Sequence, residues 1–119
     1  MNIDHIQLAI PENSEPLCRK FWTAMLGFQE LEKPENLGSR GGAWFRHGHI
    51  EIHLGVEKNF HPAEKAHPAF AVLQINLLAK TLKANDHSVL WDKSIPDRRR
   101  FFTTDPAGNR IAILEKPQK

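Results

Sequence analysis

The sequence lacks the features that would place a protein outside the cytoplasm. Its single cysteine, Cys18, excludes an internal disulfide, which fits a reducing compartment. No apolar run approaches the roughly 18 residues that a membrane-spanning helix requires. The opening residues MNIDHIQL show no basic segment followed by an apolar one, so we expect no signal peptide. We therefore predict a cytoplasmic protein without membrane contact, in which Cys18 is a packing residue and not a nucleophile.

A strong charge of one sign is also lacking. The net charge is +2 over 119 residues, and no basic stripe with interleaved aromatic residues is present, so we predict no nucleic-acid partner. The only cationic run is Arg98-Arg99-Arg100, which fits either a solvated turn or an anion contact. The length predicts one small domain, and 40% hydrophobic residues are enough for an ordinary core.

What the sequence does contain is one order of patterns that occurs twice. In the first half, alternation predicts strands over residues 3–10, 29–33, 43–46 and 49–54, and helical spacing links Leu17, Phe21, Met25 and Phe28. In the second half, the predicted strands cover residues 67–72, 88–92, 100–104 and 110–114, and Ile75, Leu78, Ala79 and Leu82 mark a helix. A polar segment with Pro62 separates the two halves.

This repetition predicts an α+β fold of two βαβββ modules in a single domain over 1–119. Module one spans about 1–57, the linker about 58–65 and module two about 66–119. Such modules are expected to form a curved mixed sheet, a cup, with the helices on its outer face. Period-two alternation assigns these residues to the concave face: His5, Gln7, Glu51, His53, His67, Ala69, Arg110, Ala112 and Leu114. Of the pair Trp44-Phe45, we expect Trp44 to face the cup as a wall for an apolar or planar ligand.

Five stretches carry a resemblance to a known superfamily. They are DHIQLAIP at 4–11, FWTAMLGF at 21–28, AWF at 43–45 with IHLGVE at 52–57, KAHPAF at 65–70, and RRRFFTTDPAGNRI at 98–111. Together they resemble the vicinal oxygen chelate superfamily, also called the glyoxalase/bleomycin-resistance/dioxygenase superfamily. The resemblance covers essentially the whole chain and rests on the order and spacing of the stretches.

The resemblance implies a divalent metal ion, such as Zn, Ni, Mn or Fe. It gives His5 and His67 the first ligand place of each module and Glu51 a third place, and His53 could add or substitute a donor. The fourth place, a glutamate of the closing strand in the family, is Ala112 here. Because that glutamate would be both ligand and base, Ala112 argues against glyoxalase I and ring-cleaving dioxygenase activity. No catalytic residue is assigned.

Two functions therefore stand side by side. The first is a metal-dependent lyase, isomerase or transferase that acts on a small oxygen-bearing metabolite. The alternative is a metal-free protein of the bleomycin-resistance type that binds a drug or metabolite, with Gln7, Trp44, Arg110 and Ala112 as ligand contacts. Each residue also has a plainer interpretation: hydrogen-bonded histidines, a solvated Glu51, Trp44 in sheet packing, and Arg110 at the rim. The resemblance further implies a homodimer.

Overall fold

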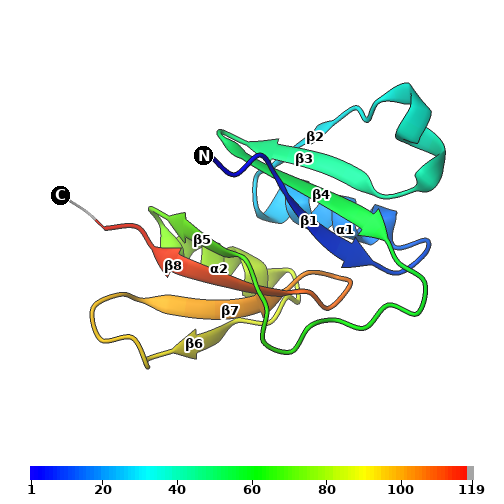
Figure 1. The fold of residues 1–119 in the computed structure, drawn as a ribbon. Helices are drawn as coiled ribbons and strands as arrows, with labels where there is room; N and C mark the ends of the chain where they lie inside the picture. The colour runs from blue at the N-terminus through cyan, green and yellow to red at the C-terminus, as the bar shows by residue number, and fades with distance from the viewer. Residues whose placement is uncertain (118–119) are drawn as a thin grey trace. The chain divides into compact units, whose positions relative to one another are not determined.

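The computed structural model describes residues 1–117 and divides into two compact units, Met1–Pro62 and Ala63–Lys119. Each unit contains one four-stranded mixed sheet with a helix packed on it, and each follows the order βαβββ (Figure 1). The predicted α+β class and the duplicated module are therefore confirmed. None of the helices within residues 1–117 is long and apolar enough to cross a membrane.

The first unit has the strand order β1-β4-β3-β2. Strand β1 is parallel to β4, and the other pairings are antiparallel. The elements in chain order are β1 (Ile6–Ile10), α1 (Glu15–Lys20), the π-helix η1 (Phe21–Met25), β2 (Gln29–Leu31), the 3-10 helix η2 (Glu35–Arg40), β3 (Ala43–His47) and β4 (Ile50–Val56).

The second unit repeats this connectivity with the strand order β5-β8-β7-β6. Strand β5 is parallel to β8, as β1 is to β4, and the two remaining pairings are antiparallel. The elements are β5 (Ala69–Val72), α2 (Ile75–Ala84), β6 (Leu90–Asp92), β7 (Arg100–Thr104) and β8 (Arg110–Glu115).

The cores of the two units use the same positions of the same strands. In the first unit Phe45 on β3 is paired with Ile52 on β4, and in the second Phe101 on β7 is paired with Ile113 on β8. All four side chains are buried. Cys18 is buried as well, in agreement with its predicted packing role.

The sequence prediction was wrong at the start of the first helix. Leu17 was assigned to the apolar stripe, but it is 66% exposed. Helix α1 changes into a π-helix at Phe21, where the backbone N–H of Leu26 donates to the carbonyl of Phe21 at 3.2 Å. The wider turn changes the helical phase. As a result the adjacent side chains of Phe21 and Trp22 are both buried, and Trp22 was missed in the sequence.

Two strands also begin later than predicted. Strand β1 starts at Ile6 and β5 at Ala69, so His5 and His67 lie just before their strands. Other boundaries follow the turn residues closely. Gly27, with a φ of 77°, ends the first helical segment as predicted, because only glycine adopts this left-handed conformation without strain.

Candidate functional site

Three aromatic rings are stacked on the first unit. Trp44 and His53 are register partners on β3 and β4, and their ring centroids are 3.9 Å apart with an interplanar angle of 5°. The ring of His5 stacks on His53 at 4.0 Å and 14°. His53 is therefore enclosed and only 4% exposed. Trp44 and His53 are opposite each other on β3 and β4 and point to the same face of the sheet, which brings their rings together. His5 comes from the segment before β1.

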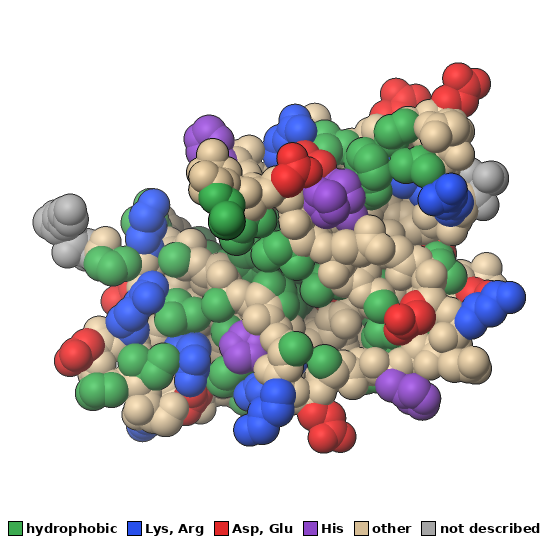
Figure 2. All heavy atoms as spheres, in the orientation of Figure 1, with side chains coloured by type: hydrophobic (Ala, Val, Ile, Leu, Met, Phe, Trp, Pro, Cys, Tyr) green, Lys and Arg blue, Asp and Glu red, His purple; other side chains and the backbone are tan. Residues whose placement is uncertain are grey.

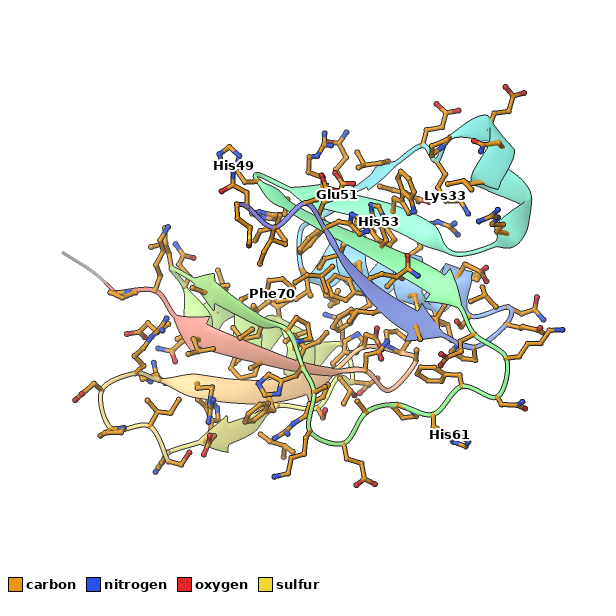
Figure 3. The ribbon with its side chains drawn as sticks, in the orientation of Figure 1. Lys33, His49, Glu51, His53, His61 and Phe70 are labelled. Carbon is orange, nitrogen blue, oxygen red and sulfur yellow. The ribbon has the colours of Figure 1, made fainter. Side chains whose placement is uncertain are left out.

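A carboxylate fixes the orientation of the central ring. Glu51 Oε2 lies 2.6 Å from His53 Nε2, and Glu51 Oε1 accepts a hydrogen bond from Arg46 Nη2 at 2.9 Å (Figure 3). Hydrogen bonds from His53 first, and then from Arg46, lower the pKa of Glu51. Since an ionised carboxylate only accepts hydrogen bonds, His53 Nε2 must carry a hydrogen.

This arrangement does not fit a metal ion shared by His5, Glu51 and His53. A protonated Nε2 has no lone pair to offer. An imidazole nitrogen binds an ion in its ring plane at about 2.0–2.1 Å, and two nearly parallel rings 4.0 Å apart cannot both do so. Within residues 1–117, no three His, Cys, Asp or Glu side chains are grouped as metal ligands. The predicted first-unit ligands are thus brought together, but as a stack and a hydrogen-bonded pair.

His5 and His67 have similar individual surroundings. His5 Nδ1 lies 2.7 Å from Asp4 Oδ2, and His67 Nδ1 donates to the backbone carbonyl of Lys65 at 2.8 Å. In the neutral form of each ring, a hydrogen on Nδ1 leaves the lone pair on Nε2. Histidines that bind metals often hold their other nitrogen in this way. Each ring therefore offers one nitrogen atom that could bind a metal ion, although both side chains are exposed.

In the second unit, Phe102 is the centre of a cationic cluster. The guanidinium carbon of Arg110 lies 4.0 Å from the Phe102 ring centroid, and that of Arg100 lies at 4.8 Å. His67 contacts the same ring edge-on at 5.3 Å. Arg110 also donates to the Glu64 carbonyl at 3.2 Å. Phe102 was not assigned from the sequence, although adjacent residues of a strand, here Phe101 and Phe102, point to opposite faces.

The closing-strand position lies directly beside this cluster. Ala112 is fully buried, with Phe102 as its partner on β7 and Ala69 as its partner on β5. The residue that the resemblance sets at the glutamate place is therefore a small, buried apolar side chain between two strands of the second unit.

The first unit also contains a cavity of about 220 Å³. Gln7 and Trp44, two of the predicted ligand contacts, line it together with Lys33 and Arg40. Gln7 lies over Gly55, where an added Cβ would be 2.6 Å from its Nε2. Lys33 and Arg40 were missed, because Lys33 was predicted only as the end of a strand over 29–33 and the residues that follow it were read only as a loop. Their positive charge in that loop was the available signal.

The protonation of His53 gives a direct test of this geometry. We expect heteronuclear NMR to find a hydrogen on Nε2 at neutral pH. The pKa of Glu51 is lowered in the folded state, so its pairing with His53 stabilises the fold fully above the ordinary Glu pKa of 4.5. This stabilisation is lost as the pH falls through the lowered pKa of Glu51 in the folded protein. Glu51→Ala should remove this pH dependence. A His53 ring that is protonated only on Nδ1 would contradict the arrangement.

Comparison with known proteins shows the family to which the chain belongs. No family model matches the sequence, and no curated protein sequence matches it. Among solved structures, one described as a glyoxalase family protein from Bacillus anthracis is 45% identical, with a TM-score of 0.92 over 98% of this chain and 96% of that chain.

Two further solved structures are similar in fold. The fosfomycin resistance protein FosX from Listeria monocytogenes has 12% identity and a TM-score of 0.79 over 98% of this chain and 94% of that chain. The antibiotic binding protein TnmS3 from a Streptomyces species has 19% identity and a TM-score of 0.73 over 98% and 99%. Given the 45% identity along nearly the whole of both chains, this protein belongs to the glyoxalase family, within the vicinal oxygen chelate superfamily.

Proposed function

We propose that the protein binds a small organic anion with a planar or apolar part in the cavity of the first unit, and that no metal ion takes part. The observation that carries the proposal is the lining of that cavity, where Trp44 and Gln7 occur together with Lys33 and Arg40. Leu37, Leu54 and Val56 complete an apolar surface. Pockets of this kind combine apolar walls with a few polar groups that orient the ligand.

The rigid placement of Trp44 supports binding. Its ring is fixed against His53, which is itself held by Glu51. A preorganised ring loses little conformational freedom when a ligand docks, so more of the contact energy appears as affinity.

The charge of the cavity favours an anion. The Lys33 ammonium donates to the backbone carbonyl of Gly41, so it is held at the lining without losing its charge (Figure 3). Glu15 lies close by and accepts a hydrogen bond from the Gly42 N–H at 2.8 Å, which is the main cause of its lowered pKa. The cavity lining thus contains two cations, Lys33 and Arg40, while Glu15 lies outside it, and this charge suits a ligand carboxylate or phosphonate.

The comparisons support a binding role in general terms. One protein of this fold binds an antibiotic and another confers fosfomycin resistance. The competing function, a metal-dependent lyase, isomerase or transferase, is favoured by one observation: Nδ1 of His5 and of His67 each has a polar partner, which leaves Nε2 as the atom for a metal ion. The proposal also includes a cytoplasmic location, which rests on the cysteine content, and a homodimer, which rests on family membership.

Benzoate tests the proposal, with benzamide as its uncharged analogue. We expect benzoate to shift the indole N–H signal of Trp44 saturably at millimolar concentration, and benzamide to bind more weakly. The double substitution Lys33→Gln, Arg40→Gln should weaken benzoate binding about tenfold or more, since a hydrogen bond to a charged group contributes about 1.5–3 kcal/mol. NMR titration measures both effects.

The matched control is the double substitution Lys58→Gln, Lys80→Gln, which removes two exposed positive charges outside the cavity lining. It should leave the benzoate affinity unchanged. If benzoate never shifts the Trp44 signal, or if both double variants behave alike, the first-unit cavity is not the anion site.

A further inference from the structure

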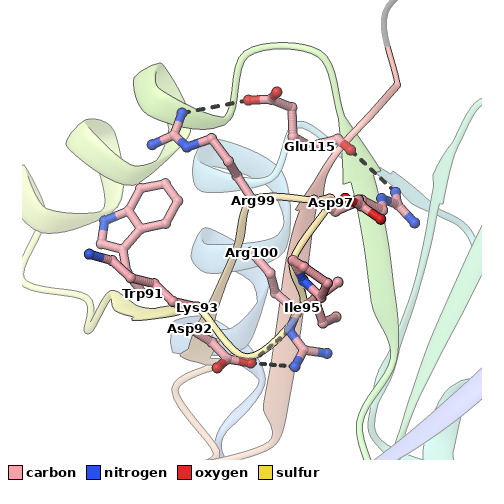
Figure 4. Close-up of a pocket in the computed structure, with 10 residues that line it drawn as sticks. Trp91, Asp92, Lys93, Ile95, Asp97, Arg99, Arg100 and Glu115 are labelled. Carbon is pink, nitrogen blue, oxygen red and sulfur yellow. Dashed lines mark hydrogen bonds and ion pairs between the residues drawn. The ribbon is translucent and has the colours of Figure 1, made fainter.

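We infer that the second unit carries a separate binding site for an organic anion, larger than the first. The site is a cavity of about 510 Å³ at the connection between β6 and β7, within the size range of about 300–1,000 Å³ of small-molecule pockets (Figure 4). Its lining includes Trp91, Lys93, Ile95, Arg98, Arg99 and Glu115.

An aromatic ring gives the cavity a fixed apolar surface. Trp91 contacts the buried Phe101 edge-on at 5.2 Å, and the guanidinium carbon of Arg99 lies 4.6 Å from its ring centroid. Trp91 is nevertheless 38% exposed, so part of its surface stays accessible. Ile95 and Pro96 add apolar surface from the loop. These groups suit the apolar part of a ligand.

The positive charges of the lining are unequally neutralised. The lining contains four cationic side chains and three carboxylates. Arg100 is paired closely with Asp92, at the bottom of Figure 4. Arg99 lies 3.5 Å from a carboxylate oxygen of Glu115, at the top of the same figure. Arg98 donates instead to the backbone carbonyl of Glu115 at 3.2 Å.

Besides these two ion pairs, the lining holds two cations, Arg98 and Lys93, and one carboxylate, Asp97, so it keeps a net positive charge. Arg98 is positioned by a neutral carbonyl, and no ion pair within residues 1–117 involves Arg98 or Lys93. In Figure 2, Lys and Arg side chains lie among hydrophobic ones over the second unit. Of the two meanings of the arginine run left open by the sequence, the geometry points to the anion contact for Arg98, while Arg100 is held by Asp92.

The duplicated fold explains why a second cavity exists. Each cavity lies where its unit passes from the second strand to the third, beside the last strand. Phe45 and Phe101 occupy the same register in the two units, so Arg100 stands at the position that Trp44 has in the first unit. The second cavity takes its aromatic surface from Trp91 on the edge strand instead. The two sites lie at equivalent places in the two units but differ in residues and size.

The three tryptophans provide a site-specific test. Trp44 lines the first cavity, Trp91 lines the second, and Trp22 is fully buried and reports on folding. The probe is 8-anilinonaphthalene-1-sulfonate, an aromatic sulfonate, and its uncharged control is N-phenyl-1-naphthylamine. We expect the sulfonate to shift the indole signal of Trp91 saturably and to bind at least about tenfold more tightly than the amine.

Matched variants separate this site from the first. Lys93→Gln with Arg98→Gln should weaken the Trp91 titration about tenfold, while Lys33→Gln with Arg40→Gln should leave it unchanged. The Trp22 signal verifies that each variant is folded. The inference is overturned by an unshifted Trp91 signal, by equal binding of the two probes, or by full affinity in the Lys93/Arg98 variant. Benzoate and Trp44 report on the first cavity, whereas the sulfonate and Trp91 report on the second. A negative result at one cavity therefore does not decide the result at the other.

Discussion

Replacing Gly42 with alanine is expected to lower the free energy of unfolding by about 3 kcal/mol or more. Gly42 has a φ of 81°, a conformation that non-glycine residues rarely adopt. An added Cβ would also lie 2.0 Å from the backbone carbonyl oxygen of Leu54. Since the obstacle is backbone in the paired strand β4, side-chain rotation cannot relieve it. Urea denaturation measures the loss.

Gly38 offers a matched control in the preceding 3-10 helix. An added Cβ there meets nothing within 4 Å, so Gly38→Ala should change stability by no more than about 0.5 kcal/mol. Gly42→Ala should also weaken benzoate binding, because Gly41 lines the first cavity and the Gly42 N–H holds Glu15. Equal stability of the two variants would contradict the close approach of Gly42 to β4.

The substitution Asp105→Ala is expected to cost about 3 kcal/mol. Asp105 is 3% exposed in the turn between β7 and β8. Its Oδ1 accepts hydrogen bonds from the backbone N–H groups of Ala107 and Asn109 at 3.0 and 2.9 Å, and its Oδ2 accepts one from Asn109 Nδ2 at 3.1 Å. Alanine removes the acceptor of all three bonds inside a buried turn, so the hairpin loses its main polar support. Thermal and urea denaturation should both report the loss.

Two controls bracket this effect. Asp4→Ala removes a carboxylate that is 91% exposed and is paired with the neighbouring His5, so its effect should stay within about 0.5 kcal/mol. Asp105→Asn keeps one acceptor oxygen and should give an intermediate loss. If Asp105→Ala unfolds at the wild-type urea concentration, the turn does not depend on its carboxylate.

The fold could be predicted because its signals are local and repeated. Strand alternation at Ile50, Ile52 and Leu54, and the same pattern at Ile111 and Ile113, depends only on the period of a strand. The π-helix at Phe21 could not be predicted in this way. It places Phe21 and Trp22 in the core together, an outcome of tertiary packing that overrides the 3.6-residue period.

The candidate site was only partly accessible from the sequence. Alternation put Glu51 and His53 on one face of β4, and pairing with β3 brought Trp44 beside His53. The stacking of His5, and the hydrogen bond between Glu51 and His53, depend on side-chain rotations that spacing does not encode. Lys33 and Arg40 reach the cavity from the connection between β2 and β3, which contains the 3-10 helix η2, and residue patterns specify the path of such a connection poorly.

The most direct test of the central claim is the metal dependence of benzoate binding at Trp44. The titration is made on protein dialysed against EDTA, and again with one equivalent of Zn²⁺, Ni²⁺ or Mn²⁺. We predict the same dissociation constant in every case, because His53 Nε2 is protonated and stacked between Trp44 and His5. Binding that appears only with metal, and is lost in both His5→Ala and His67→Ala, would contradict the account.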